Sequence, residues 1–177
     1  MSTDKEVLDL EQVRKDILVW AVDFVEVPNP KLSGWAPCPF ARRARMENKV
    51  LIDLGTLPEV DCNDIAATWD DTYEVIIFAY ERSRFTVEEM EQLVERNNRE
   101  LFMPMNLMCL EDHPDSPEVV NGVCFNQGQY ILLLFQRLSK VNDFSAGLKD
   151  KGYYDTWPKE YYDRVVSWRT QNEPDGS

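Results

Sequence analysis

The sequence has no long hydrophobic run and no excess of positive charge, and these two absences exclude several classes of function. The longest apolar stretch, Tyr-Ile-Leu-Leu-Leu-Phe at 130–135, has the length of a strand and is far too short to span a membrane as a helix. Nineteen Lys and Arg residues stand against 32 Asp and Glu residues, which gives a formal net charge of −13. Because this charge repels phosphates, we expect neither nucleic acid nor a membrane as partner.

Cysteine and histidine are also scarce. The four cysteines, at positions 38, 62, 109 and 124, have no spacing typical of a disulfide framework. The first residues carry acidic side chains and lack the apolar core of a signal peptide, so we expect a cytoplasmic protein with reduced thiols. The one histidine, His113, stands among Glu111, Asp112 and Asp115. Ligands this close in sequence rarely all point inward, so we expect no metal site.

The apolar patterns that are present predict a single α/β or α+β domain over residues 1–170, followed by a frayed polar tail at 171–177. Short apolar runs predict strands at 49–54, 73–80, 102–110 and 129–138, and periods of three and four residues predict helices at about 3–24, 39–48, 63–70, 86–101 and after 158. This order favours a mixed four-stranded sheet with packed helices. Capping boxes are expected at Thr3 with Glu6 and at Thr86 with Glu89.

The strongest functional pattern is Cys38, which lies between two prolines at the start of the predicted helix 39–48. The amides of a helix start stabilise a thiolate by about 0.3–1 kcal/mol. Lowering a thiol pKa from about 8.5 to about 6.5 needs roughly 2.7 kcal/mol, so a cation is required as well. Arg42 and Arg45, four and seven residues on, share the helix face of Cys38. The pattern predicts a thiolate nucleophile or an anion-binding corner, and the alternative is a packed thiol whose arginines are solvated or paired.

Two further residues can complete such a site. His113 follows a predicted strand and is a candidate general base towards Cys38, the alternative being a surface turn at Pro114. Arg137 ends a predicted buried strand and is a candidate clamp for an anion, provided that this strand end lies near Cys38.

The chain is similar to a small family of uncharacterised bacterial proteins that carry a Cys-Pro-Phe-Ala motif after an N-terminal helix. The motif is present here at 38–41, His-Pro-Asp follows at 113–115, and Tyr130 precedes an apolar strand that Arg137 closes. The resemblance covers about residues 10 to 145 and implies the fold and the location of the site, with Tyr130 as a ligand-binding residue. The family's Asn-Arg-Ser-Pro-Tyr-Pro stretch is replaced by Cys-Phe-Asn-Gln-Gly-Gln-Tyr at 124–130.

A second, shorter resemblance concerns the ten residues around Cys38. The run Cys-Pro-Phe-Ala-Arg-Arg-Ala-Arg at 38–45 is similar to the active-site turn of omega-class glutathione transferases and other glutaredoxin-like proteins. This resemblance implies thiol redox chemistry at Cys38. A thioredoxin-like fold, however, requires a strand directly before that cysteine, and here the residues 28–37 intervene.

Three hypotheses about function follow. The first is a small-anion-binding site, with or without catalysis, that uses Cys38 and His113 as catalytic residues and Arg42, Arg45, Tyr130 and Arg137 as ligand-binding residues. The second is a non-catalytic, acidic interaction protein or accessory subunit that binds a protein partner through the aromatic segment 153–168. The third is a glutaredoxin-like thiol redox protein. The sequence identifies neither a cofactor nor a reaction.

Overall fold

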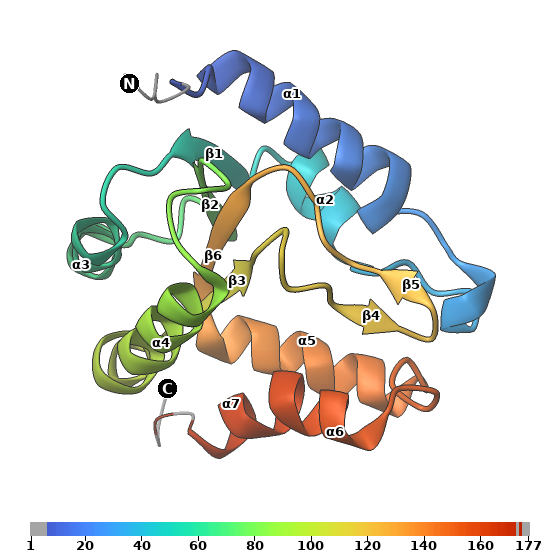
Figure 1. The fold of residues 1–177 in the computed structure, drawn as a ribbon. Helices are drawn as coiled ribbons and strands as arrows, with labels where there is room; N and C mark the ends of the chain where they lie inside the picture. Colours follow the sequence, from blue (N-terminus) through green and yellow to red (C-terminus); the bar gives the residue numbers. More distant parts are fainter. Residues whose placement is uncertain (1–6, 173, 175–177) are drawn as a thin grey trace.

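The last strand of the main sheet in chain order, β6, lies in the middle of that sheet. The computed structural model describes residues 7–172 and 174, and its four-stranded sheet has the order β1-β2-β6-β3 (Figure 1). β1 and β2 are parallel, whereas β6 is antiparallel to both β2 and β3. The prediction of a single domain with a mixed four-stranded sheet is confirmed.

The helices and strands alternate along the chain and then end in a helical C-terminal segment. The strands are β1 (Val50–Leu54), β2 (Val75–Tyr80), β3 (Leu107–Asp112), β4 (Val119–Val120), β5 (Val123–Cys124) and β6 (Ile131–Arg137). The α-helices are α1 (Leu10–Trp20), α2 (Ala41–Met46), α3 (Pro58–Thr68), α4 (Val87–Asn97), α5 (Leu138–Asp150), α6 (Lys159–Tyr162) and α7 (Trp168–Gln171). Within the described residues, no helix is both long enough and apolar enough to cross a membrane.

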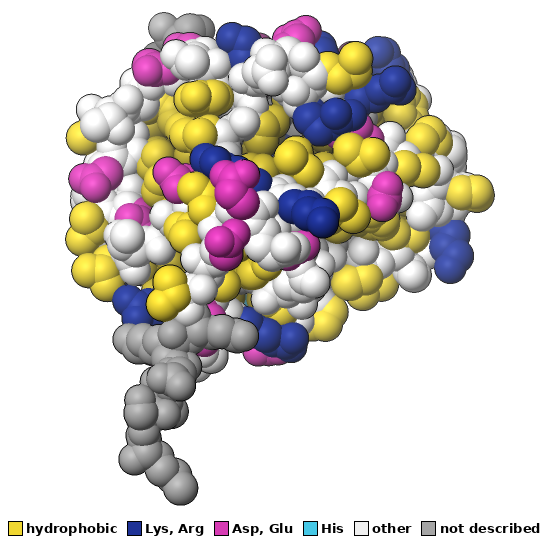
Figure 2. All heavy atoms as spheres, turned by 90° about the horizontal axis from the view of Figure 1, so that it is seen from above, with side chains coloured by type: hydrophobic (Ala, Val, Ile, Leu, Met, Phe, Trp, Pro, Cys, Tyr) yellow, Lys and Arg dark blue, Asp and Glu magenta, His cyan; other side chains and the backbone are white. Residues whose placement is uncertain are grey.

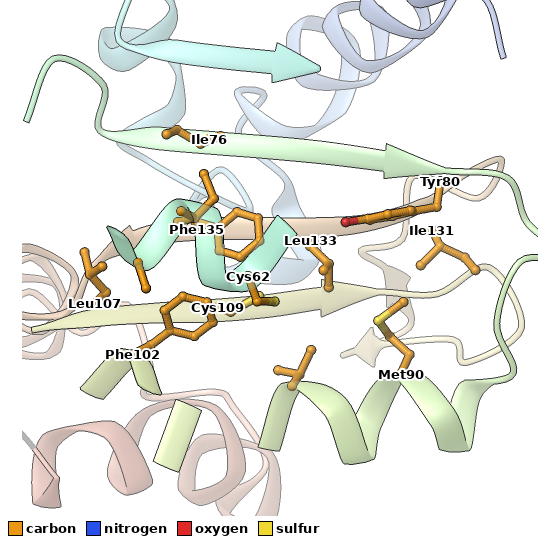
Figure 3. Close-up of a cluster of buried hydrophobic side chains, with 13 residues drawn as sticks. Cys62, Ile76, Tyr80, Met90, Phe102, Leu107, Cys109, Ile131, Leu133 and Phe135 are labelled. Carbon is orange, nitrogen blue, oxygen red and sulfur yellow. The ribbon is translucent and has the colours of Figure 1, made fainter. Parts of the chain in front are cut away.

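Both faces of the sheet are covered, which explains why its two central strands are apolar at nearly every position. On β2, Ile76 and Tyr80 face the side covered by α3 and α4, while Ile77 and Ala79 face the side covered by α1. Figure 3 shows the first of these clusters, in which Cys109 on β3 lies among the side chains of the neighbouring strands and helices. Cys109 is a core residue.

Side-chain caps explain the starts of α4 and α1. Thr86 and Glu89 form the predicted capping box of α4, with the Thr86 side chain accepting a hydrogen bond from the Glu89 N–H and the Glu89 side chain accepting one from the Thr86 N–H. The start of α1 is capped by Asp9 instead, whose carboxylate accepts from the Gln12 N–H. The capping box expected at Thr3 lies outside the described residues.

The strand predicted over 102–110 is shorter than expected. Residues Met103–Met105 form a 3₁₀ turn, and Asn106 then adopts a left-handed conformation with φ of 58°. β3 therefore begins at Leu107. Met103 and Met105 alternate as strand residues do, but Pro104 between them has no N–H to donate to a neighbouring strand. This segment therefore does not join the sheet. β3 is an edge strand, as expected.

The long loop after β3 contains a small hairpin of β4 and β5 that the sequence analysis did not predict. Asn121 and Gly122 form its turn, and both have positive φ values, of 52° and 79°. Asn-Gly is the preferred sequence for such a two-residue turn, so the signal was present but the flanking strands were too short to be recognised.

The outer edge of β3 is closed by an asparagine side chain. The Asn98 amide accepts a hydrogen bond from the Cys109 N–H and donates one to the Cys109 carbonyl oxygen, both at 2.8 Å. Asn98 is 4 % exposed and Cys109 is fully buried. The side chain thereby takes the place of a neighbouring strand at this one residue, which protects the edge from pairing with another chain.

We predict that Asn98→Ala destabilises the protein by about 2–4 kcal/mol, because it leaves a buried N–H and a buried carbonyl without partners. Asn97→Ala is the matched control, since it removes the same atoms from the adjacent buried residue. The Asn97 amide nitrogen has no hydrogen-bond partner within the described part of the chain. Denaturant unfolding of both variants measures the difference. Equal losses of stability would show that the Asn98–Cys109 pair contributes nothing of its own.

Candidate functional site

Cys38 lies in the loop before α2 and is exposed. It stands two residues before Phe40, the N-cap of α2, and its backbone N–H donates to the Val25 carbonyl oxygen at 3.0 Å. Desolvation raises the pKa of the Cys38 thiol, and the N–H groups of Phe40 and Ala41 offset this only in part. The nearby carboxylate of Glu26 raises the pKa further. The surroundings therefore favour the thiol over the thiolate.

The arginines that follow Cys38 are largely neutralised by acidic partners. Arg45 makes two hydrogen bonds to the Glu26 carboxylate, at 2.6 and 3.0 Å, and that carboxylate is only 5 % exposed. Arg43 pairs with Glu74 at 3.4 Å. Arg42 is exposed to solvent. The sequence spacing placed Arg45 on the face of Cys38, but it did not reveal that Glu26, nineteen positions earlier, would hold its charge.

His113 and Arg137 lie at opposite ends of the β3–β6 pair. Asp112, the residue before His113, is opposite Leu132 near the start of β6, whereas Arg137 is opposite Leu107 at its end. Five residues of strand separate these ends, on the order of 16 Å. A shared site of Cys38, His113 and Arg137 is therefore not supported by the geometry, because the antiparallel pairing keeps two of the three residues apart.

Two of these predicted site residues, His113 and Arg137, already have partners within the fold. The His113 ring is 3 % exposed, and its Nε2 lies 2.8 Å from the Phe85 carbonyl oxygen while Nδ1 lies 3.1 Å from the Asp115 N–H, so Nδ1 accepts and Nε2 carries the proton. Arg137 pairs with Asp71 at 2.7 Å. These contacts are structural, and catalytic or ligand-binding roles for the residues stay predictions.

Tyr130 connects the sheet to α1. Its hydroxyl donates to the Asp16 carboxylate at 2.6 Å. Desolvation and this hydrogen bond raise the pKa of Tyr130 to about 12, so the hydroxyl is protonated at neutral pH. The observed partner of Tyr130 is therefore a helix of the same chain, and its role as a ligand-binding residue stays a prediction.

A large cleft lies elsewhere, along the outer edge of β3. Its volume is about 980 Å³, and α4, the end of β3, the loop 116–126 and the C-terminal helical segment line it. Figure 1 shows α4 and the C-terminal helices on the two sides of β3. His113 contributes to the lining, whereas Cys38, Arg42, Arg45, Tyr130 and Arg137 do not. We call this feature the edge cleft.

The edge cleft contains carboxyl groups that are removed from water. Desolvation raises the pKa of Glu111 to about 7, and the nearby Glu118 and Glu91 raise it as well, while its own N–H and the guanidinium of Arg164 lower it. Desolvation also raises the pKa of Glu118, whose carboxylate accepts a hydrogen bond from the Tyr161 hydroxyl at 3.2 Å. Arg164 itself is exposed and lies over the Tyr161 ring at 5.2 Å.

A second buried carboxylate, Asp61 in α3, shows the difference between a structural acid and those of the cleft. Asp61 is 7 % exposed and accepts hydrogen bonds from the Thr56 N–H, the Thr56 hydroxyl and the Tyr80 hydroxyl, at 2.9, 3.0 and 2.7 Å. Among the described residues, no side chain donates a hydrogen bond to Glu111, and the nearby Glu118 and Glu91 raise its pKa. Its environment resembles that of a functional carboxyl more than that of a structural one.

The inner end of the edge cleft is apolar. Trp20 at the end of α1, Leu134 on β6, Phe125 after β5 and Trp168 on α7 all line it. The indole Nε1 of Trp20 is buried and has no hydrogen-bond partner among the described residues. The lining of the cleft thus combines acidic residues of the sheet edge with aromatic residues of α1, of the segment after β5 and of α7.

Three π-helical turns border the edge cleft. They are Ala21–Val25, directly after Trp20, Asn98–Phe102, which contributes Asn98 and Arg99 to the lining, and Asp163–Ser167, which contributes Arg164 and Val165. The π-helix is rare in proteins, and its single turns are frequently found at functional sites. Their concentration around one cavity supports the edge cleft as the candidate functional site.

The sequence analysis named Glu111, Asp112 and His113 as unpromising metal ligands, and His113 also as a candidate general base. In the described residues, no group of three or more His, Cys, Asp or Glu side chains is placed to hold a metal ion. The one sequence feature that pointed to the edge cleft was a group of acidic residues at the end of a buried strand, followed by a long loop. Arg164 and Trp20, which also line the cleft, come from distant segments. Nothing in the local sequence joins them to Glu111.

Comparisons with known proteins add no further information. No family model matches the chain, and no match was found among curated proteins or among solved structures. The similarity to the family with the Cys-Pro-Phe-Ala motif and the similarity to glutaredoxin-like proteins therefore both stay predictions. The argument for function depends on the geometry of the chain itself.

We predict that Cys38 reacts as an ordinary or weakly acidic thiol. Iodoacetamide alkylation followed over a range of pH is expected to give a midpoint above the value of about 8.5 for free cysteine. The Cys124→Ala background removes the other exposed cysteine. Glu26→Gln is expected to lower the midpoint, because it removes a negative charge near the sulfur. A midpoint near 6.5 in the parent chain would restore the nucleophile hypothesis.

We also predict a pH-dependent stability that Glu111 controls. Its pKa rises from 4.5 in the unfolded chain to about 7 in the folded one, so the folded state binds the proton more tightly. The resulting stabilisation is complete below about pH 4.5 and is lost as the pH rises through 7, by on the order of 2–3 kcal/mol. Glu111→Gln is expected to flatten this decline, measured by urea unfolding from pH 5 to pH 8.

Glu47→Gln serves as the control for that measurement, because Glu47 is exposed at the end of α2, outside the lining of the edge cleft. Its pH dependence is expected to match that of the parent chain. If Glu111→Gln matched the parent chain too, Glu111 would have an ordinary pKa and the cleft would not be desolvated.

Proposed function

We propose that the edge cleft binds a small organic cation, a molecule with an amine or guanidinium group attached to an apolar body. The observation that carries this proposal is the group of desolvated carboxyls at the sheet edge. Glu111 and Glu118 stand within reach of each other's charge, and Glu91 adds to the repulsion. A ligand cation among them relieves this repulsion and supplies the donors that Glu111 lacks.

The size of the cleft fits a small molecule. Ligand pockets in proteins have volumes of about 300–1,000 Å³, with mostly apolar walls and a few placed polar groups. At about 980 Å³, the edge cleft is at the upper end of that range. Its aromatic part, with Trp20 and Phe125, provides a surface for the apolar body of the ligand. Aromatic faces also attract cations, which adds to the electrostatic preference.

The cations of the cleft leave the acidic part uncompensated. Arg99 is held near Glu95 at 3.9 Å and near Glu100 at 3.1 Å, and its side chain is 66 % exposed. Arg164 lowers the pKa of Glu111, but its effect is smaller than that of desolvation, so the pKa stays above its usual value. The negative charge at Glu111 therefore exceeds the positive charge that the chain places beside it.

An anion site at Cys38 is a second candidate, favoured by one observation. The N–H groups of Phe40 and Ala41 both act on the sulfur position, so a small anion in place of the sulfur would meet two donors. Against it, Glu26 stands close enough to raise the thiol pKa. The edge cleft is the better supported of the two.

The hypothesis of an aromatic interaction surface at 153–168 has less support from the packing. Tyr153 and Tyr161 are 4 % and 9 % exposed, and Trp157 packs against both rings, at 5.4 and 5.1 Å between ring centres. These rings dock the C-terminal segment onto the domain. Exposed apolar side chains occur instead on the side of α1, where Figure 2 shows them interspersed with charged residues of both signs.

We predict that amines bind and small anions do not. Isothermal titration calorimetry with phenethylamine, agmatine and spermidine, and with phosphate and citrate, tests the proposal on the full chain. Affinity for the amines is expected to increase from pH 5.5 to pH 8, because binding requires ionised Glu111, whose pKa is about 7. Glu111→Gln is expected to weaken amine binding roughly tenfold.

The matched control is again Glu47→Gln, which removes the same charge far from the cleft and is expected to leave the affinity unchanged. Equal weakening by both variants would indicate nonspecific attraction to an acidic protein. Binding of phosphate or citrate without binding of any amine would overturn the proposal, and loss of that anion binding after alkylation of Cys38 would favour the second candidate.

A further inference from the structure

We infer that the outer face of α1 is the contact between two copies of this chain, which pair about a two-fold axis close to Val19. The exposed residues of this face are Lys15, Leu18, Val19, Val22 and Asp23, and we call them the α1 stripe. Figure 1 shows α1 on the outside of the molecule, with the sheet on its other side. This pairing does not depend on what the edge cleft binds.

The first observation is that α1 has apolar side chains on both of its sides. Val13 and Ile17 pack on the sheet and are 1 % exposed each. Leu18, Val19 and Val22 lie on the outer side and are 40 %, 51 % and 43 % exposed. Their spacing of one and three residues places them next to one another on the surface of the helix. Adjacent exposed apolar side chains of this kind indicate a surface that another molecule covers.

The second observation is the distribution of charge along the chain. Residues 10–49, which include α1 and α2, carry seven Lys or Arg and five Asp or Glu side chains, whereas the rest of the chain carries twelve and 27. Two copies that met through the acidic remainder would repel each other strongly. Figure 2 looks onto the α1 side and shows charged groups of both signs there. Contact through α1 therefore avoids most of the repulsion between two chains of net charge −13.

The third observation is that the α1 stripe is self-complementary. Lys15 and Asp23 are both exposed, and neither belongs to an ion pair within the described part of the chain. Each lies four residues from Val19, on opposite sides of it. When two α1 helices pack antiparallel about Val19, Lys15 of one copy lies opposite Asp23 of the other, and the two-fold axis forms this pair twice.

This arrangement favours a second copy over a partner of another kind. A basic protein or an anionic surface would meet one matching and one opposing charge on the stripe, whereas a second copy matches both. The contact runs along a single helix and is smaller than a standard interface of about 800 Å² per partner. We therefore expect a reversible dimer with a dissociation constant in the micromolar range.

Sedimentation equilibrium of the full chain tests the pairing. The parent chain is expected to change from monomer to dimer as its concentration rises from about 5 to about 500 µM. A parent chain that is still monomeric at the upper concentration would overturn the inference, and so would an association that continues beyond the dimer, because a two-fold contact is closed.

Val19→Asp tests the position of the axis. It places two carboxylates opposite each other at the centre of the contact and is expected to weaken dimerisation at least about 100-fold. Val60→Asp is the matched control, because Val60 is 48 % exposed on α3 and the change adds the same charge. Circular dichroism verifies that both variants are folded. Dimerisation of Val19→Asp as tight as that of the parent chain, or equal weakening by both variants, would contradict a contact at the α1 stripe.

A charge exchange tests the antiparallel arrangement. Lys15→Glu and Asp23→Lys each turn two attractive pairs into repulsive ones and are expected to weaken dimerisation about tenfold. The double variant restores opposite charges across the axis, so its dissociation constant is expected to lie within about threefold of the parent value. A double variant no tighter than the single ones would show that Lys15 and Asp23 do not face each other between copies, and the proposed axis would be wrong.

Discussion

The pairing of β6 with both β2 and β3 is the constraint on which the rest of the structure depends. β6 forms hydrogen bonds with a neighbouring strand on each side. Its apolar side chains are buried on both faces of the sheet, where helices cover them. The same pairing makes β3 an edge strand. The position of the edge cleft and the separation of His113 from Arg137 both result from the placement of β6 between β2 and β3.

The edge of β3 is used in two different ways along its length. At Cys109 the Asn98 side chain completes the hydrogen bonding, and the edge is closed. Two residues later, at Glu111, no comparable side chain is present and the strand borders the cleft. Asn98 also belongs to a π-helical turn at the cleft wall, so the residue that protects the edge helps to shape the opening beside it. Closure of the strand edge and the shape of the edge cleft therefore depend on one local arrangement.

The sequence predicted the strands and the main helices because their signals are local. The apolar runs of β2 and β6 and the capping box at Thr86 depend on neighbouring residues and were recognised. The candidate site was not, because its parts are joined only by the fold: Trp20, Glu111 and Arg164 lie on α1, β3 and the C-terminal segment. π-Helical turns have no composition signature, so their gathering at one cavity was invisible. The surroundings of Cys38 could not be predicted for a similar reason, since Glu26, which pairs with Arg45, lies outside any local pattern.

The central position of β6 also has a consequence for biosynthesis. The ribosome releases β1, β2 and β3 before the strand that joins them, so for most of translation two apolar strands have no neighbour on the side where β6 will lie. The sheet is completed only after residue 137 has left the exit tunnel, and the closing contacts between β2 and β6 span more than fifty residues. The nascent chain is thus exposed to unwanted association until late in synthesis, and a chain released early has no means of forming the finished sheet.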